Sequence, residues 1–220
     1  MAVTLRKYKA TYFPAPKIAC TSVKYLLYYI ENGNEFQSSV IDGKTKHIHD
    51  SVYSTPKFIS VDKAAISDHL RFIVVRDPIK RLISAYTNRV VFYKELAAHK
   101  LDPDLAKRLG VHPDPTIDEF FGKIAEYRLL SPSIRHHTDA QTVFFGSDLA
   151  YFHRIYTVAD LPQLVEDLSR LTGMALTLPH EQSGGPKIEA SELRPRTLLQ
   201  AAEYCAGDYA LLRDYYRFLN

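Results

Sequence analysis

The chain is poor in cysteine and has no long apolar run, and these absences exclude several classes of protein. It contains 220 residues but only two cysteines and no tryptophan. Cys20 and Cys205 are far apart in the sequence, so they form no disulfide framework and indicate a reducing compartment. No apolar run approaches the roughly 18 residues of a membrane-spanning helix. The start of the chain lacks a signal-peptide core. We therefore expect a cytoplasmic protein without a transmembrane segment.

The charge and composition narrow the range of partners. The chain has 28 Lys and Arg against 25 Asp and Glu, a formal net charge of +3. This excess is too small to indicate nucleic-acid binding, but it suits a polyanionic small ligand or an acidic glycan. Neither an internal repeat nor a low-complexity tract is present. With 46% hydrophobic residues, the length predicts one domain over residues 1–220.

The most informative stretch is Phe-Pro-Ala-Pro-Lys-Ile-Ala-Cys-Thr-Ser-Val-Lys at residues 13–24. It lies between a predicted strand at residues 10–13 and a predicted helix at residues 23–30. A strand, a tight loop and a helix form a typical phosphate cradle, because free N–H groups and the helix dipole favour an anion. Small or hydroxyl-bearing residues at the helix start would let the anion approach, namely Ala19, Cys20, Thr21 and Ser22.

Two lysines, Lys17 and Lys24, bracket this loop with positive charge. The loop contains no glycine, so it is not the nucleotide triphosphatase motif G-x-x-x-x-G-K-[ST]. The alternative interpretation is an ordinary helix start with Ser22 as the N-cap.

A second stretch follows at residues 70–86. Residues 72–75 form a continuous apolar run that predicts a buried strand. Asp77 and Pro78 are predicted to start the next helix as N-cap and first residue. Arg76 then lies at the carboxyl end of a strand, where open α/β sheets bind ligands. An arginine there and Ser84 on the helix could grip one phosphate.

Arg81 lies on the same predicted helix. It could join that phosphate site, but a surface contact with Asp77 one turn earlier is the favoured interpretation. Between the two stretches, His47 and His49 lie two residues apart and would share one face of a strand. They could act as a base and its neighbour, bind a metal, or lie on an exposed polar strand. No metal site is predicted, since no third ligand completes the set.

The two stretches together carry a resemblance. Pro-Lys-Ile-Ala-Cys-Thr-Ser-Val-Lys at 16–24 and Arg-Asp-Pro-Ile-Lys-Arg-Leu-Ile-Ser at 76–84 resemble the glycan sulfotransferase family. That family includes the heparan sulfate 2-O- and chondroitin/dermatan 4-O-sulfotransferases. Its first motif holds the 5′-phosphosulfate of 3′-phosphoadenosine 5′-phosphosulfate, and its second holds the 3′-phosphate. Residues 135–141 and 204–209 continue the resemblance weakly.

The resemblance implies a co-substrate site made of residues from both motifs: Lys17, Ala19, Cys20, Thr21, Ser22, Lys24, Arg76 and Ser84. Relatives carry a further Asn-Lys/Arg-Ser/Thr stretch near the end, which only Ser183 matches here, while Lys187 could supply the basic residue. The family's Golgi members have a membrane anchor and lumenal disulfides. Their absence resembles short bacterial members and leaves a saccharide, a lipid-linked glycan or a small alcohol as the hydroxyl-bearing acceptor.

The implied chemistry is direct sulfuryl transfer, with the acceptor hydroxyl attacking in line. Lys17 would neutralise the leaving oxygen. His49 is the first candidate for the general base, His47 the second and His137 the third. Cys20 as a nucleophile is a weaker alternative.

The fold expected is a three-layer α/β domain with a mostly parallel central sheet, a P-loop-like sulfotransferase fold. Its strands are predicted at residues 10–13, 72–75 and 154–158. Helices are predicted at residues 90–109, after a Thr116 capping box, from Asp160 to Gly173, and as a C-terminal pair within residues 194–220. Residues 131–140 are predicted to be a loop. An ATP-dependent, kinase-like phosphotransferase and a non-catalytic nucleotide- or glycan-binding module are the alternative functions.

Overall fold

The computed structural model describes residues 2–41, 43–179 and 184–218. The chain divides into two compact units, which we call the sheet unit and the helical unit. The sheet unit comprises Met1–Arg76 and Gln141–Glu181, and the helical unit comprises Asp77–Ala140 and Gln182–Asn220. Each unit is thus built from two segments that are distant in the sequence.

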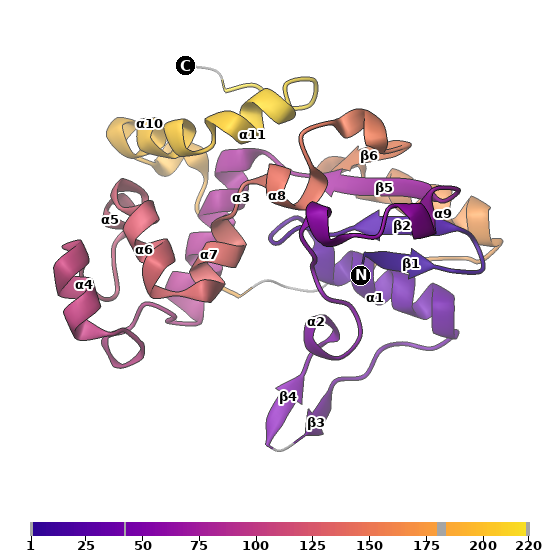
Figure 1. The fold of residues 1–220 in the computed structure, drawn as a ribbon, viewed down its shortest axis with the longest axis horizontal. Coiled ribbons are helices and arrows are strands. Elements are labelled where there is room, and N and C mark those ends of the chain that lie inside the picture. The colour runs from indigo at the N-terminus through magenta and orange to yellow at the C-terminus, as the bar shows by residue number, and fades with distance from the viewer. Residues whose placement is uncertain (1, 42, 180–183, 219–220) are drawn as a thin grey trace. The chain divides into compact units, whose positions relative to one another are not determined.

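The sheet unit contains a four-stranded sheet in the order β1–β2–β5–β6 (Figure 1). Its strands are β1 (Val3–Leu5), β2 (Ala10–Phe13), β5 (Leu70–Val75) and β6 (Arg154–Thr157). The β2–β5 and β5–β6 pairs are parallel, whereas β1 pairs with β2 antiparallel. The three strands predicted from the sequence are confirmed, and β1 is an additional strand. The fold is mixed α/β with a parallel-strand sheet, as expected.

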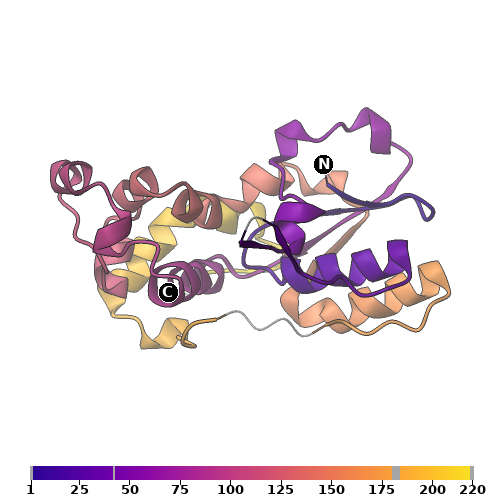
Figure 2. The same ribbon diagram turned by 90° about the horizontal axis from the view of Figure 1, so that it is seen from below.

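One face of this sheet is lined by aromatic rings. Tyr12 stacks on Phe72 with 5.3 Å between ring centroids, and Phe72 meets Tyr156 edge-on. Tyr156 donates a hydrogen bond from its hydroxyl to Asp167 of helix α9 (Leu161–Thr172) at 2.7 Å. Figure 2 shows α1 (Cys20–Asn32) and α9 side by side on one side of the sheet. The rings therefore pack beneath these helices.

The opposite face carries a second aromatic cluster. Phe13 follows Tyr12 in β2, and successive strand residues point to opposite faces. Its ring lies 5.1 Å from Phe152 and 5.9 Å from both Phe58 and Tyr151, measured between centroids. Because both faces of the sheet are covered, residues 72–75 of β5 are all buried. This explains the uninterrupted apolar run in the sequence.

Short elements complete the sheet unit. They are the hairpin strands β3 (Ser39–Ile41) and β4 (Lys44–Lys46), the helices α2 (Ile48–Ser51) and α8 (Gln141–Phe145), and the 3₁₀ turns η1 (Phe58–Ser60), η2 (Ala64–Ile66), η5 (Leu149–Tyr151) and η6 (Val158–Asp160). Strands β3 and β4 pair with each other in a separate two-stranded sheet (Figure 1). Helix α9 follows Asp160 and ends at Gly173, as predicted, with Gly173 in the left-handed region.

The helical unit contains α-helices, a π-helix and short 3₁₀ turns. They are α3 (Pro78–Ala85), the π-helix η3 (Tyr86–Phe92), η4 (Ala98–Lys100), α4 (Pro103–Leu109), α5 (Ile117–Gly122), α6 (Ile124–Leu130), α7 (Pro132–Thr138), η7 (Ala190–Glu192), α10 (Pro195–Tyr204) and α11 (Ala206–Leu211). Its core joins apolar residues of α3 to Phe120 and Tyr127, whose rings stack at 5.7 Å. The predicted C-terminal helix pair is confirmed as α10 and α11.

Capping residues set several of these helix starts. Asp77 accepts a hydrogen bond from the Lys80 N–H at 2.9 Å, and Pro78 is the first residue of α3. Thr116 and Glu119 form the reciprocal capping box of α5. Both helix starts were predicted from these residue types, and both are confirmed.

Two other predictions in this unit are wrong. The helix expected over residues 90–109 is interrupted, because Lys94 adopts a left-handed backbone with φ 52° and Asp102 caps a separate helix that begins at Pro103. The loop expected at residues 131–140 contains α7. Ser131 caps this helix by accepting from the Ile134 N–H at 3.2 Å. A Ser-Pro pair is thus an N-cap signal here.

Within residues 2–41, 43–179 and 184–218, no helix is both long enough and apolar enough to cross a membrane.

Candidate functional site

The loop between β2 and α1 has an unusual backbone. Lys17 and Ala19 adopt positive φ angles of 67° and 59°, in the left-handed region that glycine normally occupies. Ala19 is the N-cap of α1, and its carbonyl accepts the Val23 N–H at 3.1 Å. The interpretation of Ser22 as the N-cap is therefore wrong, since the helix begins at Cys20.

This geometry gives the loop the character of an anion cradle. Left-handed residues that alternate with others turn successive N–H groups toward one side. The first N–H groups of α1 have no carbonyl within the helix to bind, and the positive end of the helix dipole lies there. Ile18 is fully buried and anchors the loop between Lys17 and Ala19.

Arg76 reaches this loop from the end of β5. Its Nη1 atom donates a hydrogen bond to the carbonyl oxygen of Lys17 at 2.9 Å. Its own carbonyl oxygen accepts from Nε2 of the buried Gln141 at 3.2 Å. The guanidinium thus supports the strained Lys17 backbone and adds positive charge next to the cradle.

Lys24, His49 and Thr21 form a hydrogen-bonded network on the same side of the unit. Thr21 Oγ1 lies 2.9 Å from Nε2 of His49, and Lys24 Nζ lies 2.8 Å from Nδ1 of the same ring. Lys24 Nζ also donates to the carbonyl oxygen of Tyr53 at 2.8 Å and to Oγ1 of Thr55 at 2.9 Å. The contacts of Lys24 with Tyr53 and Thr55 were not foreseen, because no local pattern in the sequence links residues 24 and 53–55.

Lys24 is a buried cation. Its side chain is fully buried, and this burial lowers its pKa from 10.5 to about 8. The nearby groups of Cys20 and Asp50 act in the opposite direction, since negative charge there favours the ammonium form. Lys24, which the sequence predicts as a co-substrate contact, is a buried member of this network.

His47 and His49 do not lie on one strand, so that prediction is wrong. Strand β4 ends at Lys46, His47 is the N-cap of the short helix α2, and His49 is within it. The buried Ile48 between them anchors the turn. His47 is exposed, whereas His49 points to the network with Thr21.

In the helical unit, Ser84 lies half-buried on α3. Arg81 on the same helix is buried and pairs with Asp208 of α11 at 3.9 Å. The expected surface contact of Arg81 with Asp77 is therefore wrong. Asp77 instead accepts a hydrogen bond from the Tyr209 hydroxyl at 3.1 Å. The closing segment 204–209 thus holds the start of α3 in place.

His137, the third candidate base, lies on α7 of the helical unit. Its Nδ1 lies 2.8 Å from the Ser133 carbonyl oxygen, and its Nε2 accepts from Arg89 Nε at 3.0 Å. A carbonyl oxygen can only accept, so the Nδ1 atom carries the proton. Both ring nitrogens therefore bind groups of the helical unit itself.

Ser183 lies outside the described residues. The segment that follows it contacts the π-helix η3, since Asn88 Nδ2 donates to the Gly184 carbonyl oxygen at 3.2 Å. Gly185 has a φ of 109°, and a Cβ there would lie 2.3 Å from the Thr87 carbonyl oxygen. π-Helical turns often occur at functional sites. The paired glycines were the signal in the sequence, but they were not assigned to this contact.

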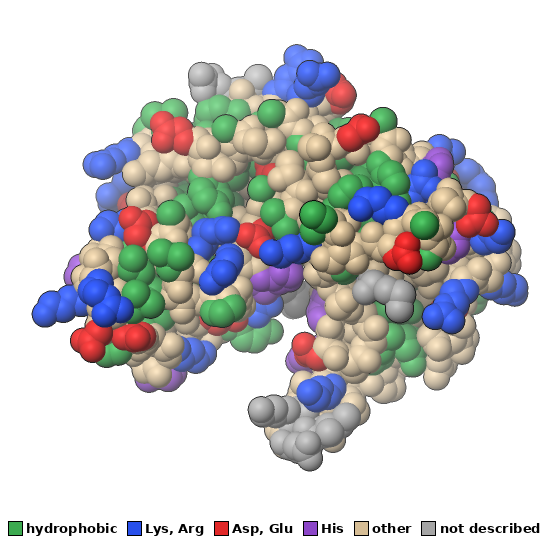
Figure 3. All heavy atoms as spheres, viewed as in Figure 1, with side chains coloured by type: hydrophobic (Ala, Val, Ile, Leu, Met, Phe, Trp, Pro, Cys, Tyr) green, Lys and Arg blue, Asp and Glu red, His purple; other side chains and the backbone are tan. Residues whose placement is uncertain are grey.

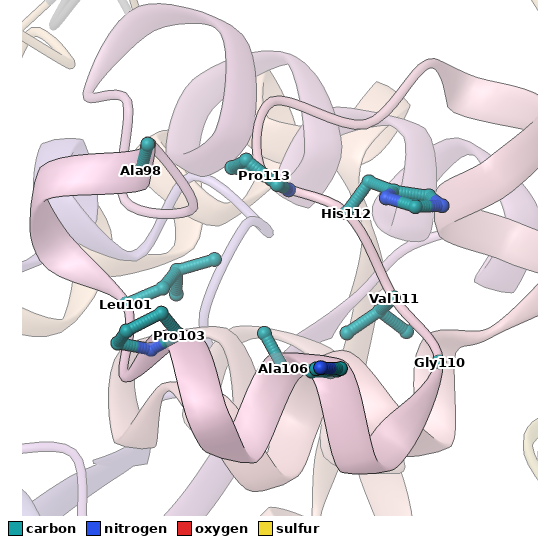
Figure 4. Close-up of a pocket in the computed structure, with 9 residues that line it drawn as sticks. Ala98, Leu101, Pro103, Ala106, Gly110, Val111, His112 and Pro113 are labelled. Carbon is teal, nitrogen blue, oxygen red and sulfur yellow. The ribbon is translucent and has the colours of Figure 1, made fainter.

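The surface of the helical unit offers two further features. Figure 3 shows Lys and Arg side chains gathered over the region of α4, where Lys100, Lys107 and Arg108 are exposed. A pocket of about 320 Å³ lies beside α4 (Figure 4). It is lined by Ala98, Leu101, Pro103, Ala106, Lys107, Gly110, Val111, His112 and Pro113. This lining includes none of the residues predicted to bind the co-substrate.

The comparisons with known proteins bear on the chain as a whole. Among the described residues, no group of three or more His, Cys, Asp or Glu side chains is placed to hold a metal ion. Neither the curated proteins nor the solved structures include a match. The family model described as "Sulfotransferase family" matches residues 1–207. This match covers both the loop of β2–α1 and the α3 motif, and the chain belongs to the sulfotransferase family.

Proposed function

We propose that this chain transfers a sulfuryl group from 3′-phosphoadenosine 5′-phosphosulfate to a hydroxyl group of an acceptor. The observation that carries the proposal is the loop before α1, in which Lys17 and Ala19 hold a left-handed backbone without glycine. Membership of the sulfotransferase family supports the reaction class. The site is proposed within one sulfotransferase domain over residues 1–220, with a P-loop-like, three-layer fold.

The loop would bind the 5′-phosphosulfate. The N–H groups at the start of α1, from Cys20 to Ser22, would face its oxygens, with the small Ala19 beside them. The ammonium group of Lys17 would neutralise charge on the leaving oxygen as the bond to sulfur breaks. Thr21 would add a hydroxyl donor. Lys24 would join this site, and its contact with His49 supports that role.

The resemblance assigns the 3′-phosphate to Arg76 and Ser84, with Ser183 as a further contact. Arginine suits this role because its planar guanidinium binds a phosphate through two parallel hydrogen bonds. Arg76 also donates to the loop carbonyl of Lys17. One side chain would thereby link the recognition of the 3′-phosphate to the shape of the 5′-phosphosulfate cradle.

The acceptor would be a carbohydrate or glycoconjugate that presents a hydroxyl group. A histidine of the turn at residues 47–49 would take the hydroxyl proton as sulfur is attacked in line. The carbohydrate and the histidine base follow from the resemblance, and the exposed imidazole of His47 is compatible with this role. We propose no metal ion in the reaction.

Thermal unfolding with adenosine 3′,5′-bisphosphate tests this function first. At about 100 times Kd a ligand raises the free energy of unfolding by roughly 2.7 kcal/mol. We expect the bisphosphate to raise the melting temperature without magnesium, and AMP to raise it less. Transfer of labelled sulfate from the sulfated co-substrate to a panel of glycans would follow. A stabilisation that requires ATP and magnesium would support the kinase-like alternative, and binding without transfer would support the binding module.

A further inference from the structure

The connection between Lys24, His49 and Thr21 determines where protons lie in the site. The side chain of Lys24 is fully buried, and its Nζ has three partners at 2.8 to 2.9 Å. An ammonium group has three protons and no lone pair, so it can only donate. Tyr53 and Thr55 accept two of these protons through oxygen atoms. The third proton is therefore directed at Nδ1 of His49.

This contact fixes the tautomer of His49. A neutral imidazole has one protonated nitrogen and one lone pair. Because Nδ1 accepts from Lys24, the proton of the ring lies on Nε2. The Nε2 atom is 2.9 Å from Oγ1 of Thr21, so His49 donates its hydrogen bond to the threonine hydroxyl.

The hydroxyl of Thr21 then has its own proton left to donate. Thr21 is the second residue of α1, two positions after the left-handed Ala19. We propose that Lys24 is a positioning residue that holds His49 as a hydrogen-bond donor, so that Thr21 directs its hydroxyl proton to an oxygen of the phosphosulfate. This inference rests on the proposed function and adds to it how the hydroxyl of Thr21 is held as a donor.

The same arrangement separates the roles of the two histidines. The lone pair of His49 faces Lys24, so it is turned away from an acceptor hydroxyl. The general base is then His47, whose imidazole is exposed at the start of α2. His49 was the first candidate from the sequence, because the sequence does not reveal that Lys24 lies against it.

The arrangement also makes the site sensitive to pH. The pKa of Lys24 is lowered to about 8 by burial, while the neighbouring Cys20 and Asp50 oppose this shift. The other titratable group facing it among the described residues is the ring of His49, whereas Tyr53 contacts Lys24 through its backbone carbonyl oxygen, which does not titrate. Once Lys24 loses its proton, its amine can accept from Nδ1–H. The tautomer of His49 then reverses, and the threonine donates to the ring instead of to the ligand.

Nitrogen-15 NMR of labelled histidine tests the tautomer directly in the unliganded protein. The His49 signals are assigned by their loss in His49→Gln. We expect the Nε2–H tautomer near neutral pH and a change to Nδ1–H as pH rises through the pKa of Lys24. Lys24→Met should abolish this pH step, whereas Lys57→Met, at an exposed lysine of the same unit, should keep it. An Nδ1–H tautomer or an imidazolium near neutral pH would overturn the proposal.

Kinetics of substitutions at the two histidines test the roles. Glutamine keeps an N–H donor but is no base, so His49→Gln should keep kcat within about tenfold while His47→Gln loses about 10²–10⁴-fold. His49→Ala should weaken bisphosphate binding. If His49→Gln loses as much kcat as His49→Ala with unchanged bisphosphate Kd, the positioning role is wrong. The NMR result is independent of turnover, so a wild-type protein that binds no bisphosphate would contradict the proposed function alone.

Discussion

The Nη1 atom of Arg76 donates a hydrogen bond to the carbonyl oxygen of Lys17 at 2.9 Å. This contact joins the end of β5 to the loop before α1, which is 59 residues earlier in the chain. A substitution of Arg76 tests whether this side chain also binds the ligand. Arg76→Lys should weaken bisphosphate binding by about tenfold or more, because an ammonium group cannot reproduce the planar fork.

Two ligands separate the possible roles of Arg76. If it contacts the 3′-phosphate, the substitution should weaken adenosine 3′,5′-bisphosphate much more than AMP in calorimetric titration. Equal losses for both ligands would limit Arg76 to support of the loop.

Two substitutions of Lys17 should have the same effect on activity but different effects on stability. Lys17→Gly and Lys17→Ala both remove the ammonium group, so each should lower kcat by about 10²–10³-fold. Glycine relieves the left-handed strain at φ 67°, whereas alanine keeps it. The glycine variant should therefore be more stable than the alanine variant by about 1 kcal/mol in urea unfolding. Equal stabilities would contradict the strained backbone.

The buried ammonium of Lys24 should make stability depend on pH. Its pKa is about 8 in the folded chain, against an ordinary value of 10.5. Between these two pH values the unfolded chain binds more protons than the folded chain. The free energy of unfolding therefore rises with pH, by at most about 1.4 kcal/mol per pH unit. Denaturant unfolding should show this rise from about pH 8 to 9.5 relative to Lys24→Met. Parallel pH profiles for the wild-type protein and Lys24→Met would show that the pKa of Lys24 is not lowered in the folded chain.

Asp208 should contribute more to the stability of the fold than Asp68, which pairs with a lysine on the surface. Asp208→Ala leaves the buried guanidinium of Arg81 without this counter-charge, which typically costs about 3–5 kcal/mol. Asp68→Ala is the control, because its ion pair with Lys9 is exposed to water and should contribute little to stability. Chemical unfolding of both variants measures the difference. Similar small losses would mean that water or other groups compensate Arg81.

Gly185 is expected to tolerate no side chain. Its φ of 109° and the 2.3 Å approach of a Cβ to the Thr87 carbonyl oxygen require a backbone shift in Gly185→Ala. The segment after Ser183 should then detach from η3, with lower stability and weaker bisphosphate binding. Gly207→Ala is the matched control, because a Cβ there meets nothing within 4 Å. A fully stable Gly185→Ala would contradict the contact.

The sequence predicted the elements whose signals are local. The apolar run of residues 72–75, the Asp77-Pro78 helix start and the Thr116 capping box each involve residues within a few positions. The position of the loop before α1 followed from the same kind of pattern.

The missed features depend on residues distant in the sequence. Lys24 is bound by atoms of residues 49–55, and Arg81 by Asp208, so neither partner could be identified from spacing alone. The helix α2 was missed because it has only four residues, and the spacing of His47, its N-cap, and His49 within it also matches the period of a strand. The signal at Ser131 was present in the sequence but was read as part of a loop.

The absence of glycine from the loop before α1 also affects the unfolded chain. Prolines at 14 and 16 fix their own φ angles, and Ile18 and Ala19 have fewer accessible conformations than glycine. The unfolded loop therefore has less conformational entropy to lose than a glycine-rich loop of equal length. The chain thus combines backbone strain in the folded loop with a smaller entropic cost of ordering that loop.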